Sequence, residues 1–315
     1  MINGLSLHNF RNIRRARLEF SETFNVITGA NGSGKTSIFE AISFAGFGNS
    51  PFGAPVSDVI MKGEQRAVIH ATGTNANISI DLADQGKKKI TLDQKKVDRV
   101  SDILGIFPQT LIGPNEVSII TGGPVERRKM LNMHICQTDP HYTTALRNYD
   151  HILQNRNRTL KDRRHFNEIM ITAIDRELAK NMQILVAARR AFIEVITPLA
   201  AELYTQIAAG KLELSYRPSF HENAEDYLDA LKKRRQHELD RRTTTIGPNR
   251  DEMLIRVDTR PAREFASWGQ KRIASIVILI AASKALFTDK HKPSILLDDC
   301  FAELDTQKTQ NLLEL

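Results

Sequence analysis

The sequence is poor in cysteine and in long apolar runs, and each shortage excludes a class of protein. Its 315 residues contain only Cys136 and Cys300, too few for the disulfide framework of a small secreted domain. No run of about 18 apolar residues occurs, and the N-terminus lacks the apolar core of a signal peptide. We therefore predict a cytoplasmic protein in a reducing compartment, with no membrane span.

Aromatic residues are also scarce, at 6% of the chain with a single tryptophan. Binding of single strands by stacking bases on aromatic side chains is therefore disfavoured. Basic residues are in excess, with 44 Lys and Arg against 37 Asp and Glu and a formal net charge of +7. This charge permits a polyanionic partner without requiring one.

Short basic runs recur along the chain, and any single one is more often a solvated face than a binding site. A DNA-binding surface would recruit several, because the phosphate backbone supplies most of the affinity. The runs are Lys87–Lys89, Lys95–Lys96, Arg127–Lys129, Lys232–Arg235 and Arg241–Arg242.

Strand-like alternation is found at both ends of the chain, whereas helical spacing dominates the middle. Helices are predicted at 35–44, at 223–240 and at 267–287, with three or four more within 125–208. Strands are predicted at 2–8, 17–20, 24–28, 66–71, 77–82, 88–92, 212–217, 253–257 and 294–297.

This order predicts an α/β fold that is interrupted by a helical insertion. Residues 1–122 and 245–315 should pack together as one domain, and residues 123–244 should form a helical arm.

The strongest motif is GANGSGKT at Gly29–Thr36, which fits the phosphate-binding loop pattern. Glycines let the backbone fold around an anion, and the N–H groups at the start of the following helix then point at it. Lys35 would reach the β- and γ-phosphates of ATP and serve catalysis, and Thr36 would bind Mg²⁺. The remaining residues expected to line the nucleotide are Gly29, Ala30, Asn31, Gly32, Ser33, Gly34 and Ser37.

The second motif is SILLDDCFAELD at Ser294–Asp305, an apolar strand that ends in two acids. Open α/β sheets bind ligands at the carboxyl ends of their strands. Asp298 would hold Mg²⁺, and Asp299 would orient or deprotonate the attacking water. The alternative is an ordinary buried strand that ends in two solvated acids.

The third motif is SWGQKR at Ser267–Arg272, which opens the long helix predicted at 267–287. Ser267 is a natural N-cap, and Gly269 and Gln270 beside it would complete a second phosphate contact. A simple helix cap is the alternative. The motif lies one helix and one loop before the aspartates, which is where ABC-type ATPases place their signature sequence.

The order of these motifs resembles that of SMC-like ATPases. Four further segments resemble the RecF family of bacterial recombination mediators, and together they cover most of the chain apart from the middle of the arm. They are LHNFRNIRRARLEF at the start, TGGPVERRKMLN at 121–132, IGPNRDEM at 246–253 and DDCFAELD after the last predicted strand.

The resemblance implies a two-lobed ABC-type P-loop ATPase head with an inserted arm, ATP and Mg²⁺ as cofactors, and slow hydrolysis. It also implies a homodimer that forms on ATP binding and holds DNA, as duplex or at junctions of single and double strands. RecO and RecR are the implied partners in loading RecA at single-strand gaps. Lys35, Thr36, Asp298 and Asp299 would form the site within one subunit. Ser267 and Gly269 would complete the partner's site, and Asp305 would lie at the interface.

The sequence departs from the family in a few places. Asn249 stands where the family usually has His, and Trp268 is bulky for a signature loop. Gln109 is the candidate for the glutamine that completes the metal site. The family continues through a further strand beyond Asp305, so the sequence either is truncated or lacks that strand. An SMC-like ATPase subunit of a nuclease or defence system is the alternative function, and a transporter ATPase ranks last.

Overall fold

The structure is a computed structural model that describes residues 1–113, 115–220, 223–287, 292–300 and 309–310. Its contacts divide the chain into two compact units. The first is Met1–Pro114 with Ala282–Ala302, and the second contains Asn115–Ala281. The predicted boundaries of an arm at 123–244 stay a prediction.

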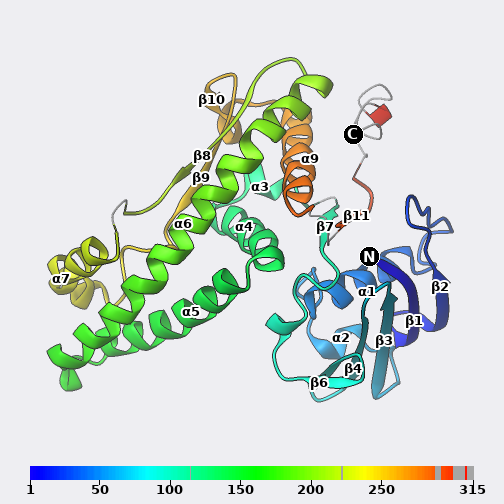
Figure 1. Ribbon diagram of the computed structural model, residues 1–315, viewed down its shortest axis with the longest axis horizontal. Coiled ribbons are helices and arrows are strands. Elements are labelled where there is room, and N and C mark those ends of the chain that lie inside the picture. The colour runs from blue at the N-terminus through cyan, green and yellow to red at the C-terminus, as the bar shows by residue number, and fades with distance from the viewer. Residues whose placement is uncertain (114, 221–222, 288–291, 301–308, 311–315) are drawn as a thin grey trace. The chain divides into compact units, whose positions relative to one another are not determined.

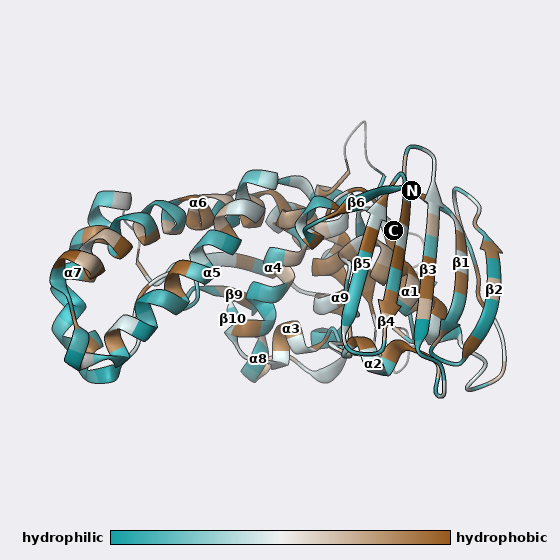
Figure 2. Ribbon diagram, turned by 90° about the horizontal axis from the view of Figure 1, so that it is seen from below, coloured by the Kyte–Doolittle hydropathy of each residue, from teal (hydrophilic) through white to brown (hydrophobic). Residues whose placement is uncertain are grey.

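The first unit is built on an antiparallel sheet with the strand order β2-β1-β3-β4-β5-β6 (Figures 1 and 2). Alternate residues along β3 and β4 are buried, as expected for strands with one face on a core. The five strands predicted between residues 2 and 92, other than the one at 24–28, are confirmed. The bounds are β1 (Ile2–Phe10), β2 (Ile13–Glu19), β3 (Arg66–Gly73), β4 (Asn77–Ala83), β5 (Lys87–Leu92) and β6 (Lys95–Val97).

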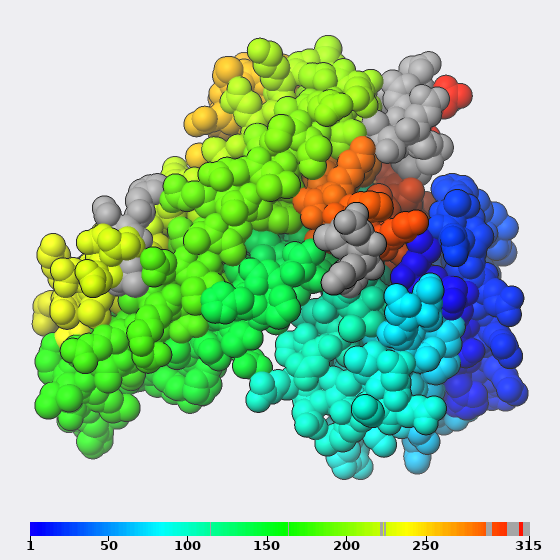
Figure 3. Space-filling model, in the orientation of Figure 1, coloured from blue at the N-terminus to red at the C-terminus, as the bar shows by residue number. Residues whose placement is uncertain are grey.

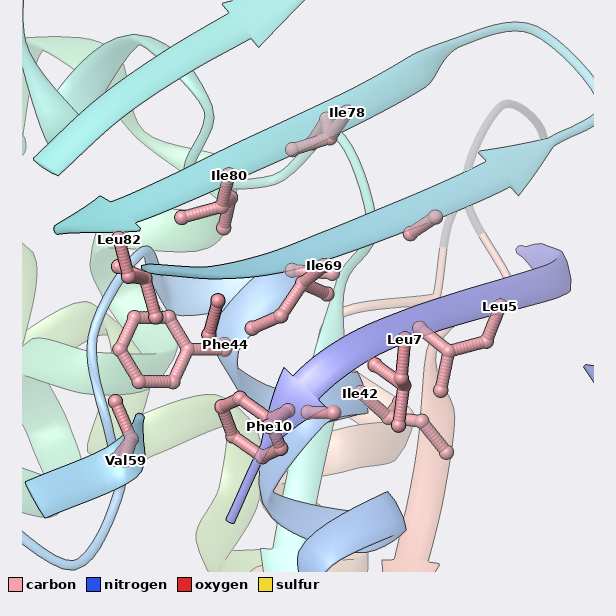
Figure 4. Close-up of a cluster of buried hydrophobic side chains, with 14 of the residues drawn as sticks. Leu5, Leu7, Phe10, Ile42, Phe44, Val59, Ile69, Ile78, Ile80 and Leu82 are labelled. Carbon is pink, nitrogen blue, oxygen red and sulfur yellow. The ribbon is translucent and has the colours of Figure 1, made fainter. Parts of the chain in front are cut away.

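Helix α1 (Lys35–Phe47) shares a core with one face of this sheet (Figure 4). Ile42 and Phe44 of α1 lie among aliphatic side chains from β1, β3 and β4. The rings of Phe10 and Phe44 meet edge-on, with centroids 6.2 Å apart. The core therefore holds α1 in place, and the phosphate-binding loop directly precedes this helix. Two short helices, α2 (Val56–Val59) and η1 (Val100–Asp102), complete this part of the unit.

Two segments far apart in the sequence form a parallel pair in the same unit. Strand β7 (Gln109–Ile112) pairs with β11 (Ser294–Leu297) in a register that sets Ser294 opposite Gln109. Leu296 of β11 packs against the core of the six-stranded sheet. The predicted strand at 294–297 is confirmed, and it belongs to the unit that carries the phosphate-binding loop.

The predicted buried strand at 24–28 is wrong. These residues form no strand, and the side chains of Phe24 and Val26 are each 69% exposed. The side-chain amide of Asn25 bonds the backbone of Ser21 instead: Ser21 N donates to Asn25 Oδ1 at 2.8 Å, and Asn25 Nδ2 donates to Ser21 O at 3.0 Å. Such local side-chain bonds satisfy a turn and compete with strand pairing.

The second unit is mainly helical, and its longest helix, α6, runs beside α5 and packs on α7 and β8 (Figures 1 and 3). With 40 residues, α6 spans about 60 Å. It passes through Pro198 without ending, and Thr197 Oγ1 donates to Ile193 O at 2.6 Å one turn earlier. The helices are α3 (Ser118–Thr121), α4 (Pro124–Thr138), α5 (Pro140–Lys161), η2 (Arg163–His165), α6 (Glu168–Ile207), α7 (Ala224–Arg241), α8 (Ala262–Phe265) and α9 (Trp268–Ala285).

A three-stranded sheet in the order β10-β9-β8 completes this unit. It consists of β8 (Leu212–Arg217), β9 (Glu252–Val257) and β10 (Arg260–Pro261), which confirms the strands predicted at 212–217 and 253–257. Helix α9 confirms the helix predicted at 267–287, and it buries its apolar residues from Ile273 to Ala282. In the described part of the chain, no helix is both long and apolar enough to cross a membrane.

Candidate functional site

The phosphate-binding loop has backbone that only glycine adopts easily. Gly32 has φ +77° and Gly34 has φ +103°, both in the left-handed region. A Cβ on Gly34 would lie 3.1 Å from both Asn12 Oδ1 and Ile13 Cγ1. The loop is therefore pressed against the start of β2, and helix α1 begins directly after Gly34 with its N–H groups at the loop.

Lys35 folds back over this loop. Its Nζ donates to Gly29 O at 2.9 Å and to Ala30 O at 3.0 Å. The ammonium group thus lies where a phosphate chain cradled by the loop could replace the two carbonyl oxygens. Thr36 is exposed and Ser37 is half-buried at the first turn of α1. The geometry fits an anion held by glycine backbone, one lysine and a helix start.

Asn12 braces the loop from the turn between β1 and β2. Its Nδ2 donates to Gly32 O at 2.7 Å, and its Oδ1 accepts from Ser37 Oγ at 2.9 Å. One amide therefore joins the loop to the first turn of α1. The sequence analysis did not assign Asn12 to the site, although the Phe-Arg-Asn segment that contains it was one of the family markers.

Arg11 fixes the same turn to the middle of α1. Its Nε and Nη2 donate to the two carboxylate oxygens of Glu40 at 2.7 and 2.8 Å, and Nη1 donates to Asp58 O at 2.8 Å. The hydrogen bond with Glu40, which is 2% exposed, raises the pKa of Arg11 above its ordinary value. Because Arg11 holds the turn, Asn12 is presented to the loop in one orientation.

We expect Asn12→Ala to weaken ATP binding by about 5-fold to 150-fold, because the loop loses two hydrogen bonds of about 0.5 to 1.5 kcal/mol each. Titration with a fluorescent ATP analogue measures this loss. The melting temperature of the nucleotide-free variant should change little, since Asn12 is exposed. If Asn12 acts through Ser37, the double variant Asn12→Ala with Ser37→Ala should lose less ATP-binding free energy than the sum of the losses in the two single variants. Unchanged affinity would remove Asn12 from the site.

The two predicted acids follow β11, beside the end of β7. Asp298 N donates to Ile112 O at 3.0 Å, which continues the parallel ladder by one bond, and its side chain is half-buried. Asp299 is exposed and has φ +50°, so the chain turns out of the strand at this residue. Both carboxylates are thus at the carboxyl end of a strand in the unit that holds the phosphate-binding loop.

The chemistry of these donors suits Mg²⁺. A threonine hydroxyl and a carboxylate are hard oxygen ligands, and Mg²⁺ on a nucleotide takes few protein ligands beside phosphates and waters. Within the described residues, no three His, Cys, Asp or Glu side chains gather into a metal-binding group. A metal ion here would therefore depend on Thr36, Asp298 and the nucleotide together.

Gln109, the predicted further metal ligand, lies at the start of β7, and its metal role stays a prediction. It is 1% exposed at the start of β7, and its Nε2 lies 3.3 Å from both Ile42 O and Ser43 O of α1. A Cβ on Gly46 of α1 would overlap this amide. In the parallel register Gln109 is opposite Ser294, about 10 Å from the strand end that carries Asp298. The amide therefore fastens β7 to α1.

The signature-like segment forms a capping box at the start of α9. Ser267 N donates to Gln270 Oε1 at 2.8 Å, and Gln270 N donates to Ser267 Oγ at 3.3 Å. Gln270 therefore has a structural partner in this unit, which the sequence analysis did not foresee. A Cβ on Gly269 would meet no atom of the described residues within 4 Å, so packing against those residues does not require glycine there. Trp268 is 53% exposed.

The segments 121–132 and 246–253 meet through a buried ion pair. Arg127 donates to both carboxylate oxygens of Glu252, at 2.7 and 2.9 Å, and Arg128 donates to Asp251 O at 2.8 Å. Asn249, where the family usually has His, accepts a 2.6 Å hydrogen bond from Tyr149. These family markers therefore hold the second unit together.

Some residues of the predicted basic runs also make contacts inside the protein. Arg235 is buried and pairs with Asp175 at 2.7 Å. Lys88 donates to Gly48 O at 2.6 Å at the end of α1, and burial lowers its pKa. Arg127, Arg235 and Lys88 therefore each bond a group in their own unit. The number of basic residues in a run therefore exceeds the number of cations that it exposes on the surface.

Known proteins match this chain along its whole length. A model of the RecF/RecN/SMC N terminal domain covers residues 1–315. The DNA replication and repair protein RecF of Agathobacter rectalis is 30% identical over 99% of this chain and 88% of its own length. RecF of Streptomyces avermitilis is 30% identical over 100% of this chain and 90% of its own length. The chain belongs to the RecF family.

Solved structures agree with this assignment. A structure described as the recombination mediator protein RecF-ATP in the RecFOR pathway has a TM-score of 0.91, with 29% identity over 100% of this chain and 89% of that chain. An Smc head domain from Pyrococcus furiosus has a TM-score of 0.58 at 19% identity over 99% of this chain and 85% of that chain, which shows the fold alone. The predicted ABC-type head fold and the resemblance to the RecF family of DNA replication and repair proteins are confirmed.

Proposed function

We propose that this chain is an ATP-dependent recombination mediator that uses slow hydrolysis as a switch. The observation that supports it best is the loop 29–36, with its left-handed glycines, folded lysine and helix start, in a chain that matches RecF proteins throughout. A solved RecF relative that is 29% identical to this chain is described with ATP, which supports ATP as the nucleotide.

The residues of one subunit can perform hydrolysis by positioning and charge. Lys35 would leave its carbonyl partners and neutralise the β- and γ-phosphates as they bind. Thr36 and Asp298 would hold Mg²⁺, which supplies further charge neutralisation at the phosphates. Asp299 would orient the attacking water and accept its proton. Asn12 would keep the loop and the first turn of α1 in register throughout.

The site is completed by a second copy in this proposal. No described residue of the same chain packs against the Cα of Gly269, and Ser267 caps the start of helix α9 beside it. A two-fold dimer would bring each signature segment to the partner's nucleotide, twice by symmetry. ATP would therefore join the subunits, and hydrolysis would release them.

DNA is the proposed substrate of the dimer, with RecO and RecR as partners in loading RecA at gaps. The relatives' description as mediators in the RecFOR pathway supports this assignment. The alternative, a subunit of a nuclease system, gains nothing from the structure, since the described residues contain no metal-binding group of His, Cys, Asp and Glu.

The experiment that tests this function measures duplex binding with ATP, with ADP and without nucleotide. We expect tight binding with ATP alone, falling steeply between 50 and 200 mM salt, the range over which about six to ten phosphate contacts lose orders of magnitude. Equal binding in all three states would contradict an ATP switch. Binding that does not respond to salt would contradict recognition through the DNA backbone.

We expect Asp299→Asn to bind ATP nearly normally and to hydrolyse it at least about 100-fold more slowly, since positioned proton acceptors contribute about 10² to 10⁴. Asparagine also tolerates the left-handed backbone at this residue, so the turn after β11 should persist. Single-turnover hydrolysis and equilibrium binding separate the two effects. A normal rate in this variant would assign the water-positioning role to another residue.

A further inference from the structure

The six-stranded sheet has a second face that no part of the hydrophobic core covers. We call this the outer face. Its residues alternate along each strand with the buried residues, and the strand register sets them side by side. Its side chains are half-buried or exposed throughout. They are Gly4, Ser6, His8, Arg15, Arg17, Glu19, Arg66, Val68, His70, Thr72, Asn77, Ser79, Asp81, Ala83, Lys87, Lys89, Thr91 and Lys96.

Cations dominate the outer face. Six Arg and Lys stand against two acids, a formal balance of 6 − 2 = +4, and one of those acids, Asp81, is already paired with Arg66. Across the described residues, no carboxylate pairs with Arg15, Arg17, Lys87 or Lys89. These four cations lie on β2 and β5, toward the two edges of the sheet, and Lys96 on β6 pairs with Asp98 at 3.2 Å.

Small and hydroxyl-bearing residues occupy the middle of the face. One register row runs from Arg17 through Ser6, His70, Ser79 and Thr91 to Lys96. The surface is hollowed along β1, β2 and β3, with one cavity of about 610 Å³ that Arg17, Ser6, His70 and Thr72 help to line. Hydroxyl and imidazole groups therefore lie between two cationic edges.

This composition fits a nucleic-acid backbone better than a protein. Protein interfaces depend on buried aromatic and apolar anchors, and Val68 and Ala83 are the apolar side chains of this face. Interfaces with nucleic acid are more polar and more positive, and most of their hydrogen bonds reach phosphate and sugar from Arg, Lys, Ser, Thr and Asn. The absence of aromatic residues from the face disfavours stacked single strands.

The dimensions fit as well. Five steps between six strands span about 24 Å at about 4.8 Å each. A duplex lying along that span presents about seven base pairs, since its rise is about 3.4 Å per pair. We propose that the outer face is a binding surface for the phosphate backbone of duplex DNA, a placement that rests on the proposed DNA-binding function.

The test compares two pairs of neutralising substitutions with the same change in net charge. Arg15→Gln with Arg17→Gln removes cations from the outer face at β2. The control, Arg14→Gln with Lys95→Gln, removes cations from β2 and β6 at positions that alternate to the opposite side of the sheet. All four side chains are exposed, so neither pair should disturb the core. Each protein is titrated with a labelled duplex of 20 base pairs in ATP and magnesium, at several salt concentrations.

We expect the outer pair to bind duplex about 10- to 100-fold more weakly, with a slope of log affinity against log salt reduced by about 2, because each lost phosphate contact removes about 0.9. The control should stay within about twofold of the unaltered protein, and all proteins should bind ATP equally. A second outer pair, Lys89→Gln with Lys96→Gln, should also weaken binding, because the proposed duplex crosses all six strands. Equal binding by the β2 outer pair and the control would overturn the surface. Failure of the unaltered protein to bind duplex at all would overturn the proposed DNA-binding function instead.

Discussion

Lys35→Ala should abolish tight ATP binding, with an affinity loss of at least about 100-fold. The lysine is the one mobile cation of the loop, and hydrogen bonds between charged groups contribute about 1.5 to 3 kcal/mol each. Among the described residues its Nζ bonds the carbonyl oxygens of Gly29 and Ala30 and pairs with no carboxylate, so its removal leaves no buried unpaired charge there. Equilibrium titration with labelled ATP measures the loss.

Lys35→Arg is the control that keeps the charge. It should still bind ATP but hydrolyse it poorly, because the planar guanidinium places its donors differently from an ammonium group. Nucleotide-free melting temperatures should agree for the two variants and the unaltered protein. Unchanged affinity in Lys35→Ala would rule out the phosphate-binding role of the loop, however well the motif fits.

Ser267→Arg should bind ATP nearly normally yet fail to dimerise and to hydrolyse. In the proposed dimer this side chain approaches the γ-phosphate held by the other copy, and arginine adds bulk and charge at that contact. Loss of the capping box with Gln270 would itself cost about 1 kcal/mol of stability. Ser267→Ala removes the cap without the bulk, so it measures that structural contribution separately.

Mixing variants gives the stronger test of a shared site. Ser267→Arg supplies an intact phosphate-binding loop, and Lys35→Ala supplies an intact signature segment, so a mixed dimer contains one complete site. Partial ATPase activity should return on mixing, up to about a quarter of the sites in a random mixture. If mixing restores nothing while both variants stay folded, or if Ser267→Arg and Ser267→Ala behave alike, Ser267 is a helix cap only.

Motifs and periodicity were sufficient for most of the fold. The helix after GANGSGKT and the strand before Asp298 are both local patterns, set by apolar spacing and by glycine, and both were found in the structure. The strand predicted at 24–28 shows the limit of this reasoning. Its apolar residues fit a strand, but strand pairing depends on neighbouring strands that periodicity does not reveal. The hydrogen bonds between Ser21 and Asn25 form a local turn there instead.

The contacts that local sequence patterns did not reveal all join distant segments. Asn12 reaches Gly32 across 20 residues, and Gln109 reaches Ile42 across 67. Arg127 pairs with Glu252 across 125 residues. No local pattern distinguishes a buried, paired cation from an exposed one, so the basic runs include Arg127 and Arg235, which are paired with acids.

The central claim is that ATP joins two copies of this chain around a shared site, and sedimentation equilibrium tests it most directly. The exposed Trp268, the single tryptophan of the chain, provides an optical signal for the same event through its emission. With magnesium and ATP the Asp299→Asn variant should double in mass from 35.5 kDa, and its tryptophan emission should shift to the blue as the indole leaves water. The same variant with ADP should stay at the single-chain mass. A mass that remains 35.5 kDa at saturating ATP and micromolar protein would contradict the account.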